Sequence, residues 1–128
     1  YVITAEELAE GKRFKDAIVH KAEFIVDIHN PSGAGQAEET IQYCKPYDLP
    51  YRCFIPRKVA NLYTAGRCIS GTHRAHASYR VMSICMAMGE AVGVAAALCA
   101  KKNCDTRNLQ ISELQETLGR KGIDLFSA

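Results

Sequence analysis

The most prominent pattern in the chain is a long run of apolar and small residues from Val81 to about Lys101. The run predicts a helix with apolar or small side chains on nearly every side, including Ala87, Gly89 and Gly93. A helix that is apolar all round must be buried all round. The rest of the chain predicts only short strands and two small helices as cover. We therefore expect this helix to pack against a partner, which is more of the same polypeptide, another subunit or lipid.

A membrane span is the alternative reading of the same run. About twenty residues cross a bilayer, and Gly89-x-x-x-Gly93 is a helix-dimerisation pattern. Against it stands Glu90, because a charged group near the centre of a span costs roughly 2.5–3.5 kcal/mol on insertion scales. The alanines around it are weakly apolar, and no aromatic belt flanks the run. We therefore expect no membrane span and close packing against other protein elements.

The N-terminal residues predict a short helix followed by an ambiguous segment. Thr4 followed three residues later by Glu7 is a capping-box pattern, which predicts a helix that begins at Ala5 and ends by Gly11. Residues 13–20 (RFKDAIVH) fit a helical turn and an irregular lead-in equally well.

Two short strands and a short extended piece are predicted in the middle of the chain. Residues 24–28 (FIVDI) alternate with the period of a half-buried strand, and the loop 30–35 (NPSGAG) ends it. Prolines leave room only for a short extended piece at 51–55. Residues 62–65 (LYTA) predict the second strand, and the polar stretch 67–79 predicts a loop.

The end of the chain predicts a connector at 105–109 and a final amphipathic helix. Ser112 with Gln115 is read as the cap of this helix, which ends near Gly122. A few short strands, one long buried helix and a C-terminal amphipathic helix together predict an α+β fold.

Composition narrows the class of protein. Of 128 residues, 48% are hydrophobic and 23% charged, which is the balance of a globular domain. The net charge of +2 is small, so no nucleic-acid footprint is indicated. The six cysteines form no C-x-x-C pair and no zinc-finger spacing, so we expect no metal site. We expect free thiols, which favours a reducing compartment such as the cytoplasm. The cysteines are Cys44, Cys53, Cys68, Cys85, Cys99 and Cys104.

The segment 61–98 carries the chemistry. Its sequence places a short strand ending at Gly66, a polar loop and the start of the long helix one after another. A turn beside a helix N-terminus favours anions, because unpaired N–H groups point outward with partial positive charge behind them.

These residues resemble a known family. Residues 26–31 (VDIHNP), 46–56 (PYDLPYRCFIP) and above all 61–98 are similar to the C-terminal segment of FAD-dependent oxidoreductases. They most resemble a bacterial branch whose flavin motif reads AGRCIS…RVM…CMAMG-x-A-x-G. The wider class includes fumarate reductases, aspartate oxidases and glutathione-reductase-like enzymes. The resemblance is densest from 47 to 98, specific for the family and uninformative about the substrate.

The resemblance implies an α+β fragment of an α/β, Rossmann-like flavoprotein. Residues 1–57 would belong to a substrate or cap region and linker, 58–104 to the C-terminal part of the FAD-binding domain, and 105–128 to a terminal helix. The Gly-x-Gly-x-x-Gly turn that holds the FAD pyrophosphate does not occur in the sequence. We therefore expect a separate N-terminal FAD-binding half. The chain alone should bind FAD poorly or not at all, lack activity and form a homo-oligomer through its uncovered helix.

The resemblance also implies cofactor-facing residues. Gly66 would let the backbone approach the cofactor, and N–H groups at the helix start would lie near the pyrimidine edge of the flavin. Arg67 stands where most of the class has an acidic residue that bonds a flavin or ribityl hydroxyl. This departure removes that contact, and an arginine here could reach the pyrophosphate instead. The cofactor-binding residues predicted are Gly66, Arg67, Ser70, Arg80, Val81 and Met82.

Four residues are predicted to be catalytic. The resemblance supports His29 through DIHNP, Arg52 through PYR, and both His73 and Arg80 through GTH…YRVM. An oxyanion substrate suits the fork of an arginine, and proton delivery suits a histidine of near-neutral pKa. Structural alternatives stay open: His29 as a loop cap, Arg52 as a loop brace and His76 as a packing residue.

The function implied is transfer of a hydride or electrons between the flavin and a small organic substrate. The alternative is a non-catalytic binding or self-association module that keeps the shape without the cofactor.

Overall fold

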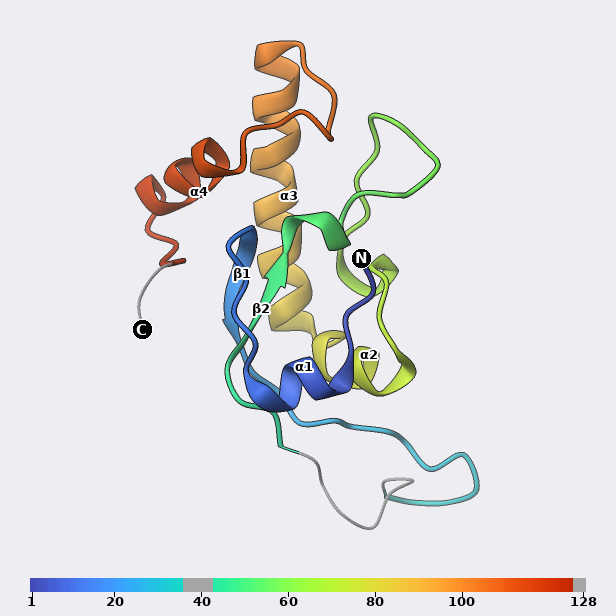
Figure 1. Cartoon of the computed structure of the whole chain (residues 1–128). Helices are drawn as coiled ribbons and strands as arrows, with labels where there is room; N and C mark the ends of the chain where they lie inside the picture. The colour runs from blue at the N-terminus through green and yellow to red at the C-terminus, as the bar shows by residue number, and fades with distance from the viewer. Residues whose placement is uncertain (36–42, 126–128) are drawn as a thin grey trace.

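The protein is a two-stranded antiparallel sheet packed among helices (Figure 1). The computed structural model describes residues 1–35 and 43–125. In chain order the elements are α1 (Ala5–Glu10), β1 (Ala17–Ala22), β2 (Tyr47–Pro50), the one-turn 3₁₀ helices η1 (Tyr51–Cys53) and η2 (Gly66–Cys68), α2 (His73–Tyr79), α3 (Met82–Lys102) and α4 (Ile111–Arg120). The predicted α+β class is confirmed.

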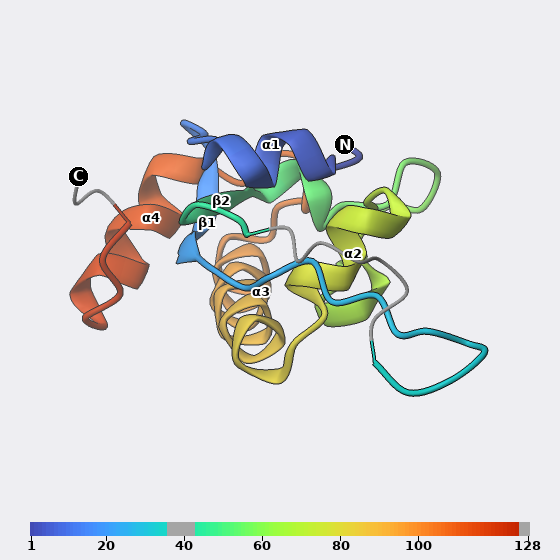
Figure 2. The ribbon, with the colours of Figure 1, turned by 90° about the horizontal axis from the view of Figure 1, so that it is seen from below.

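The sheet lies between α1 and α3, as the view in Figure 2 shows. β1 contacts α3 and α4, while β2 contacts α1. The strands pair Val19 with Leu49 and Ala22 with Tyr47, with irregular register between the pairs. All four residues of β2 are buried, so this short strand is the centre of the core.

A buried carboxylate ties the sheet to the segment that precedes it. Asp48 of β2 accepts hydrogen bonds from Arg13 Nε (3.1 Å) and from the backbone N–H of Phe14 (3.1 Å). Its other oxygen lies 2.7 Å from Nδ1 of the buried His20 on β1. A buried carboxylate must be compensated in this way, so the cluster fixes the register of the two strands.

The predicted capping box is confirmed at α1. Thr4 Oγ1 accepts from the Glu7 N–H (3.4 Å), and Glu7 Oε2 accepts from the Thr4 N–H (3.0 Å). The helix ends at Gly11, which adopts a left-handed φ of 69°.

The final amphipathic helix is also present, but its predicted cap is wrong. α4 begins after Gln110 with no side-chain cap. Gln115 instead points into the core, where its amide donates to the carbonyls of Lys15 and Ala17, each at 2.9 Å. Those two carbonyls lie at the entry to β1, so Gln115 joins α4 to the sheet.

The long helix is confirmed, although the described residues bury it on one side only. The buried stripe follows a spacing of three to four residues: Ile84, Met88, Ala91, Ala95 and Cys99. On other faces Met82 and Met86 are 74% and 70% exposed, and Figure 2 shows no described element below α3. The expectation of burial on every side is therefore not met by the residues described. Length and composition (mean hydropathy 1.7) would also allow α3 to cross a membrane.

The two predicted strands and the predicted extended piece are wrong. Residues 24–28 and 62–65 form no strand, and 51–53 form η1, closed by a hydrogen bond from the Phe54 N–H to the Tyr51 carbonyl (3.0 Å). Alternation describes burial and not pairing, and a strand needs a neighbour. The neighbours that pair are 17–22, in the ambiguous segment, and 47–50, which lies just before the predicted extended piece.

The predicted loop 67–79 contains two helical segments, η2 and α2. Thr72 caps α2 by accepting a hydrogen bond from the Ala75 N–H (3.3 Å). The helix buries Ala75, Ser78 and Tyr79. The loop interpretation therefore failed over the residues that carry the predicted catalytic His73 and the candidate packing residue His76.

Candidate functional site

A shallow pocket of about 240 Å³ brings together three of the four predicted catalytic residues. Asp27, Ile28 and His29 form one side. The other side is one face of α2 and the residue after it, because positions spaced three and four apart lie on the same side of a helix. The residues on that face are His73, His76, Ala77 and Arg80.

Asp27 organises the charged groups of this pocket. Its carbonyl accepts a hydrogen bond from Arg80 Nη2 (2.9 Å), and its carboxylate lies 3.7 Å from the same nitrogen. The carboxylate also pairs with His29 Nε2 at 3.2 Å. Asp27 was not among the predicted site residues. Its position two residues before His29, in the quoted segment VDIHNP, was the signal available.

The two histidines of α2 differ in their packing. His76 packs edge-to-face against the buried Tyr79, with ring centroids 5.3 Å apart. This supports the packing role considered for His76, although its side chain also lines the pocket. His73 is exposed at the first turn of α2. Among the predicted proton carriers in the pocket, His73 therefore has the least evident structural role.

Arg80 is the group in this pocket that is suited to an anionic ligand. Three histidines and the carboxylate of Asp27 line the pocket with it, and the single arginine and single carboxylate offset each other's charge. Arg80 keeps 32% of its side chain exposed, and a guanidinium fork binds a carboxylate in bidentate fashion. In the part of the chain that the structure describes, no three His, Cys, Asp or Glu side chains are placed to hold a metal ion.

Open hydrogen-bond donors adjoin the pocket. Arg80 is followed directly by Val81, the N-cap of α3, which supplies no side-chain cap. The first α3 bond to that cap residue runs from the Cys85 N–H to the Val81 carbonyl (3.0 Å). The N–H groups of Met82 and Ser83 precede it and have no partner within the helix. Both residues are exposed, so this end of α3 offers donors and partial positive charge to solvent.

The predicted turn glycine lies beside the same end of α3. Gly66 has a φ of +64°, which favours glycine. A Cβ added there would lie 3.6 Å from Cys85 Sγ, so η2 packs against the first turn of α3. Arg67 is exposed on η2. The Ser70 carbonyl accepts a hydrogen bond from the Ile3 N–H (3.1 Å) and holds the N-terminal segment.

Arg52 does not line this pocket. It forms an ion pair with Asp16 at 2.6 Å, and its guanidinium stacks over the Tyr1 ring at 4.5 Å from the centroid. It borders a different hollow, together with Arg57 and Arg107. Its catalytic role stays a prediction that the described geometry does not join to the others.

Comparison with known proteins identifies the family. A family model described as FAD dependent oxidoreductase matches residues 1–118. No curated protein and no solved structure matches the chain. The matched range contains the whole pocket, η2 and α3. The chain therefore belongs to the FAD-dependent oxidoreductase family, whose complete proteins use FAD as cofactor.

Proposed function

We propose that the complete protein transfers a hydride or electrons between FAD and a small organic anion, and that this chain supplies one edge of the flavin site and part of the substrate site. One observation carries the proposal. Arg80 lines the pocket, and the two residues that follow it, Val81 and Met82, form the uncapped start of α3. Substrate and cofactor groups would therefore meet at this joint.

The donors present fit the flavin. Backbone N–H groups at the start of α3 suit the carbonyl oxygen and developing negative charge of the flavin pyrimidine ring. Gly66 gives η2 the left-handed turn that lies beside them. Gly66, Val81 and Met82 would hold this edge of the cofactor, and Arg67 and Ser70, both exposed nearby, would face its ribityl and phosphate part. When bound, FAD supplies the centre that accepts or donates the hydride.

The N-terminus of α3 would change the reduction potential of the flavin only modestly. A helix N-terminus stabilises negative charge by about 0.3–2 kcal/mol. For a two-electron couple about 30 mV corresponds to 1.4 kcal/mol, so the potential rises by at most a few tens of millivolts. The substrate pocket, and not the helix dipole, must therefore decide which reaction is catalysed.

The side chains of the pocket would have different roles. Arg80 binds and orients the oxyanion of the substrate, and Asp27 holds Arg80 and His29 in position. His73, exposed and at the first turn of α2, holds or moves the proton that accompanies hydride transfer. His76 shapes the wall through its contact with Tyr79.

The uncovered side of α3 supports a larger assembly. Exposed methionines next to Gly89 and Gly93 form a surface suited to close packing against protein. We propose that the N-terminal FAD-binding half covers it in the complete protein, and that copies of this chain cover one another when that half is missing. The stripe of α3 packed on β1 and α4 favours this over a membrane span. A non-catalytic module would share this surface but would not need an anion-binding arginine in the pocket.

The decisive experiment measures flavin reduction in the complete protein. Replacing His73 or Arg80 with alanine should slow turnover at least about tenfold, a lower bound beside the roughly 10²–10⁴-fold that general acid–base catalysis contributes. Arg80→Ala should also weaken substrate binding, because it removes the oxyanion contact. Arg120→Ala is the matched control, since Arg120 on α4 pairs only with the exposed Glu116 among described residues.

Unchanged rates in both site variants would refute the assignment of this pocket. A complete protein that lacks bound FAD and reduces no acceptor would favour the non-catalytic module.

A further inference from the structure

Two thiols meet at the far end of α3 because of the way the helix ends. Asn103 adopts a left-handed conformation, and its N–H donates to the Ala100 carbonyl (3.3 Å). The Cys104 N–H donates to the Cys99 carbonyl (3.1 Å). This pair of bonds is a Schellman motif, in which the first and last side chains normally make an apolar contact. Here those two side chains are the thiols of Cys99 and Cys104.

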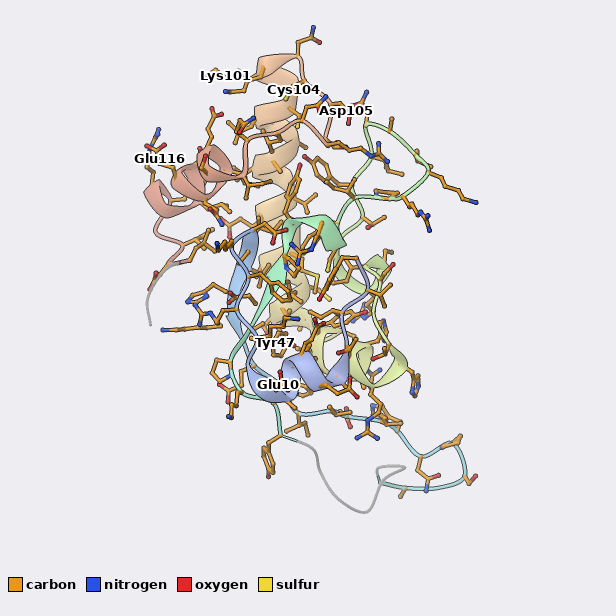
Figure 3. All side chains as sticks on the ribbon, viewed as in Figure 1. Glu10, Tyr47, Lys101, Cys104, Asp105 and Glu116 are labelled. Carbon is orange, nitrogen blue, oxygen red and sulfur yellow. The ribbon has the colours of Figure 1, made fainter. Side chains whose placement is uncertain are left out.

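The thiols are reachable from solvent. Both line a hollow of about 340 Å³ with Tyr63 and Thr106. Cys99 is 7% exposed, whereas Cys104 is half-buried. Figure 3 shows Cys104 at the turn that follows α3, beside Lys101 and Asp105. A small molecule therefore meets Cys104 first, with Cys99 directly behind it.

A chain of hydrogen bonds fixes Cys99. The Tyr51 hydroxyl donates to the Thr106 carbonyl (2.6 Å), so it accepts from the Tyr63 hydroxyl. Tyr63 has then used its only proton, so its oxygen accepts from the Cys99 thiol, 3.3 Å away. This order of donors holds the Cys99 sulfur at the wall of the hollow.

We propose that Cys99 and Cys104 form a dithiol site that a small-molecule disulfide, such as oxidised glutathione, converts to an intramolecular disulfide. The Cys104 thiolate attacks one sulfur of the oxidant and releases the first small thiolate. The Cys99 sulfur then attacks the Cys104 sulfur and releases the second. Two electrons pass to the oxidant, and the two protons go to the released thiolates. The backbone bond between the two residues supplies the close approach that a disulfide requires.

The reaction should be slow at neutral pH and faster in alkali. Partial desolvation, together with a hydrogen bond to Cys99, raises the pKa of the Cys104 thiol above its ordinary value. Since the thiolate is the attacking species, the rate rises as the pH approaches that pKa. Forming the disulfide would remove the thiol proton that Cys99 donates to the Tyr63 oxygen. It would also link the last turn of α3 covalently to the connector.

The test is to incubate the purified chain with oxidised glutathione, quench with acid, digest and measure peptide masses. The peptide spanning Cys99 and Cys104 should be lighter by two hydrogen atoms and carry no glutathione. The exposed Cys68 should carry a mixed disulfide with glutathione. Dithiothreitol should restore all thiols.

Two variants sharpen the result. Cys68→Ser should still form the bridge, whereas Cys104→Ser should leave Cys99 unbridged with an unchanged circular dichroism spectrum. The proposal is overturned if Cys99 and Cys104 stay reduced when Cys68 is fully modified, or if glutathione remains on Cys104 as a stable adduct. Neither outcome bears on the flavin site, because the thiol pair lies at the opposite end of α3.

Discussion

At the scale of single residues, Gly71 is a position where a close contact leaves no room for a side chain. Its isolated bridge to Ile3 brings the N-terminal segment alongside it. A Cβ added at Gly71 would lie 2.7 Å from Tyr79 Cε1. Tyr79 is fully buried, and its hydroxyl donates to the Ile69 carbonyl (3.2 Å). Because its ring is buried and its hydroxyl is hydrogen-bonded, Tyr79 cannot move away from a side chain added at Gly71.

Gly71→Ala should consequently destabilise the protein by about 1–3 kcal/mol, the usual cost of overpacking a core. The measurement is the urea midpoint followed by circular dichroism. Gly119→Ala is the control, because nothing lies within 4 Å of a Cβ at Gly119 in α4. It should be neutral or stabilising. Equal stability of Gly71→Ala and the unchanged chain would show that Tyr79 can move.

The site residues illustrate what sequence can supply at this scale. The motif segments named His29, His73 and Arg80, and the structure places them in one pocket. Asp27 was missed because its importance lies in contacts to residues two and more than fifty positions away. Arg52 came from an equally specific motif, yet its ion pair with Asp16 sets it apart. Motifs name residues, whereas contacts between distant segments group them.

At the scale of elements, local signals predicted helices and failed for strands. α1 and α3 were predicted from a cap and from an apolar run, both of which lie within the element itself. β1 and β2 depend on each other across a separation of about thirty residues, which alternation in one segment does not encode. α2 was missed although Thr72 is a good N-cap residue. Its polar composition concealed a helix whose buried face is made of Ala, Ser and Tyr.

The exposed side of α3 leads to a prediction about association. Met82 and Met86 are exposed over an otherwise small-residue surface, so the isolated chain should self-associate to cover it. Met86→Glu should shift the chain to the monomer in sedimentation velocity, because a buried unpaired carboxylate opposes association. Leu62→Glu, on an exposed residue outside α3, should leave association unchanged. An unchanged chain that is monomeric at every concentration would contradict the prediction.

At the scale of the whole molecule, the long helix separates two kinds of chemistry. Its N-terminal end adjoins the polar pocket and η2, and its C-terminal end carries the thiol pair and the tyrosine hydroxyls. The sheet and α4 pack against this helix on one side, and α1 covers the opposite face of the sheet (Figure 2). The molecule is therefore built around α3, with the two proposed sites at the two ends of this helix.

Buried tyrosines make the stability of the fold sensitive to alkali. Burial raises the pKa of Tyr51 and of Tyr79 to about 12, from an ordinary value of 10.0. Above pH 10 the unfolded chain loses these protons first. The stability these groups contribute is thus complete below pH 10 and is lost as the pH rises toward 12.

The urea midpoint should accordingly fall across this range. Tyr79→Phe should flatten the fall, whereas Tyr43→Phe, on an exposed ring, should not. A midpoint that is constant from pH 10 to pH 12 would contradict the expected ionisation.

The joint between α2 and α3 constrains how such a protein can diversify. Arg80 ends one helix and Val81 caps the next, so no spare residue separates them. Each residue of a helix turns it by about 100°. Inserting one residue at this joint would rotate the Arg80 guanidinium about the helix axis. The guanidinium would then no longer lie beside the start of α3. Under the proposed function, new substrates are therefore accommodated by exchanging side chains along the pocket wall, while changes in length are left to surface loops such as 56–61.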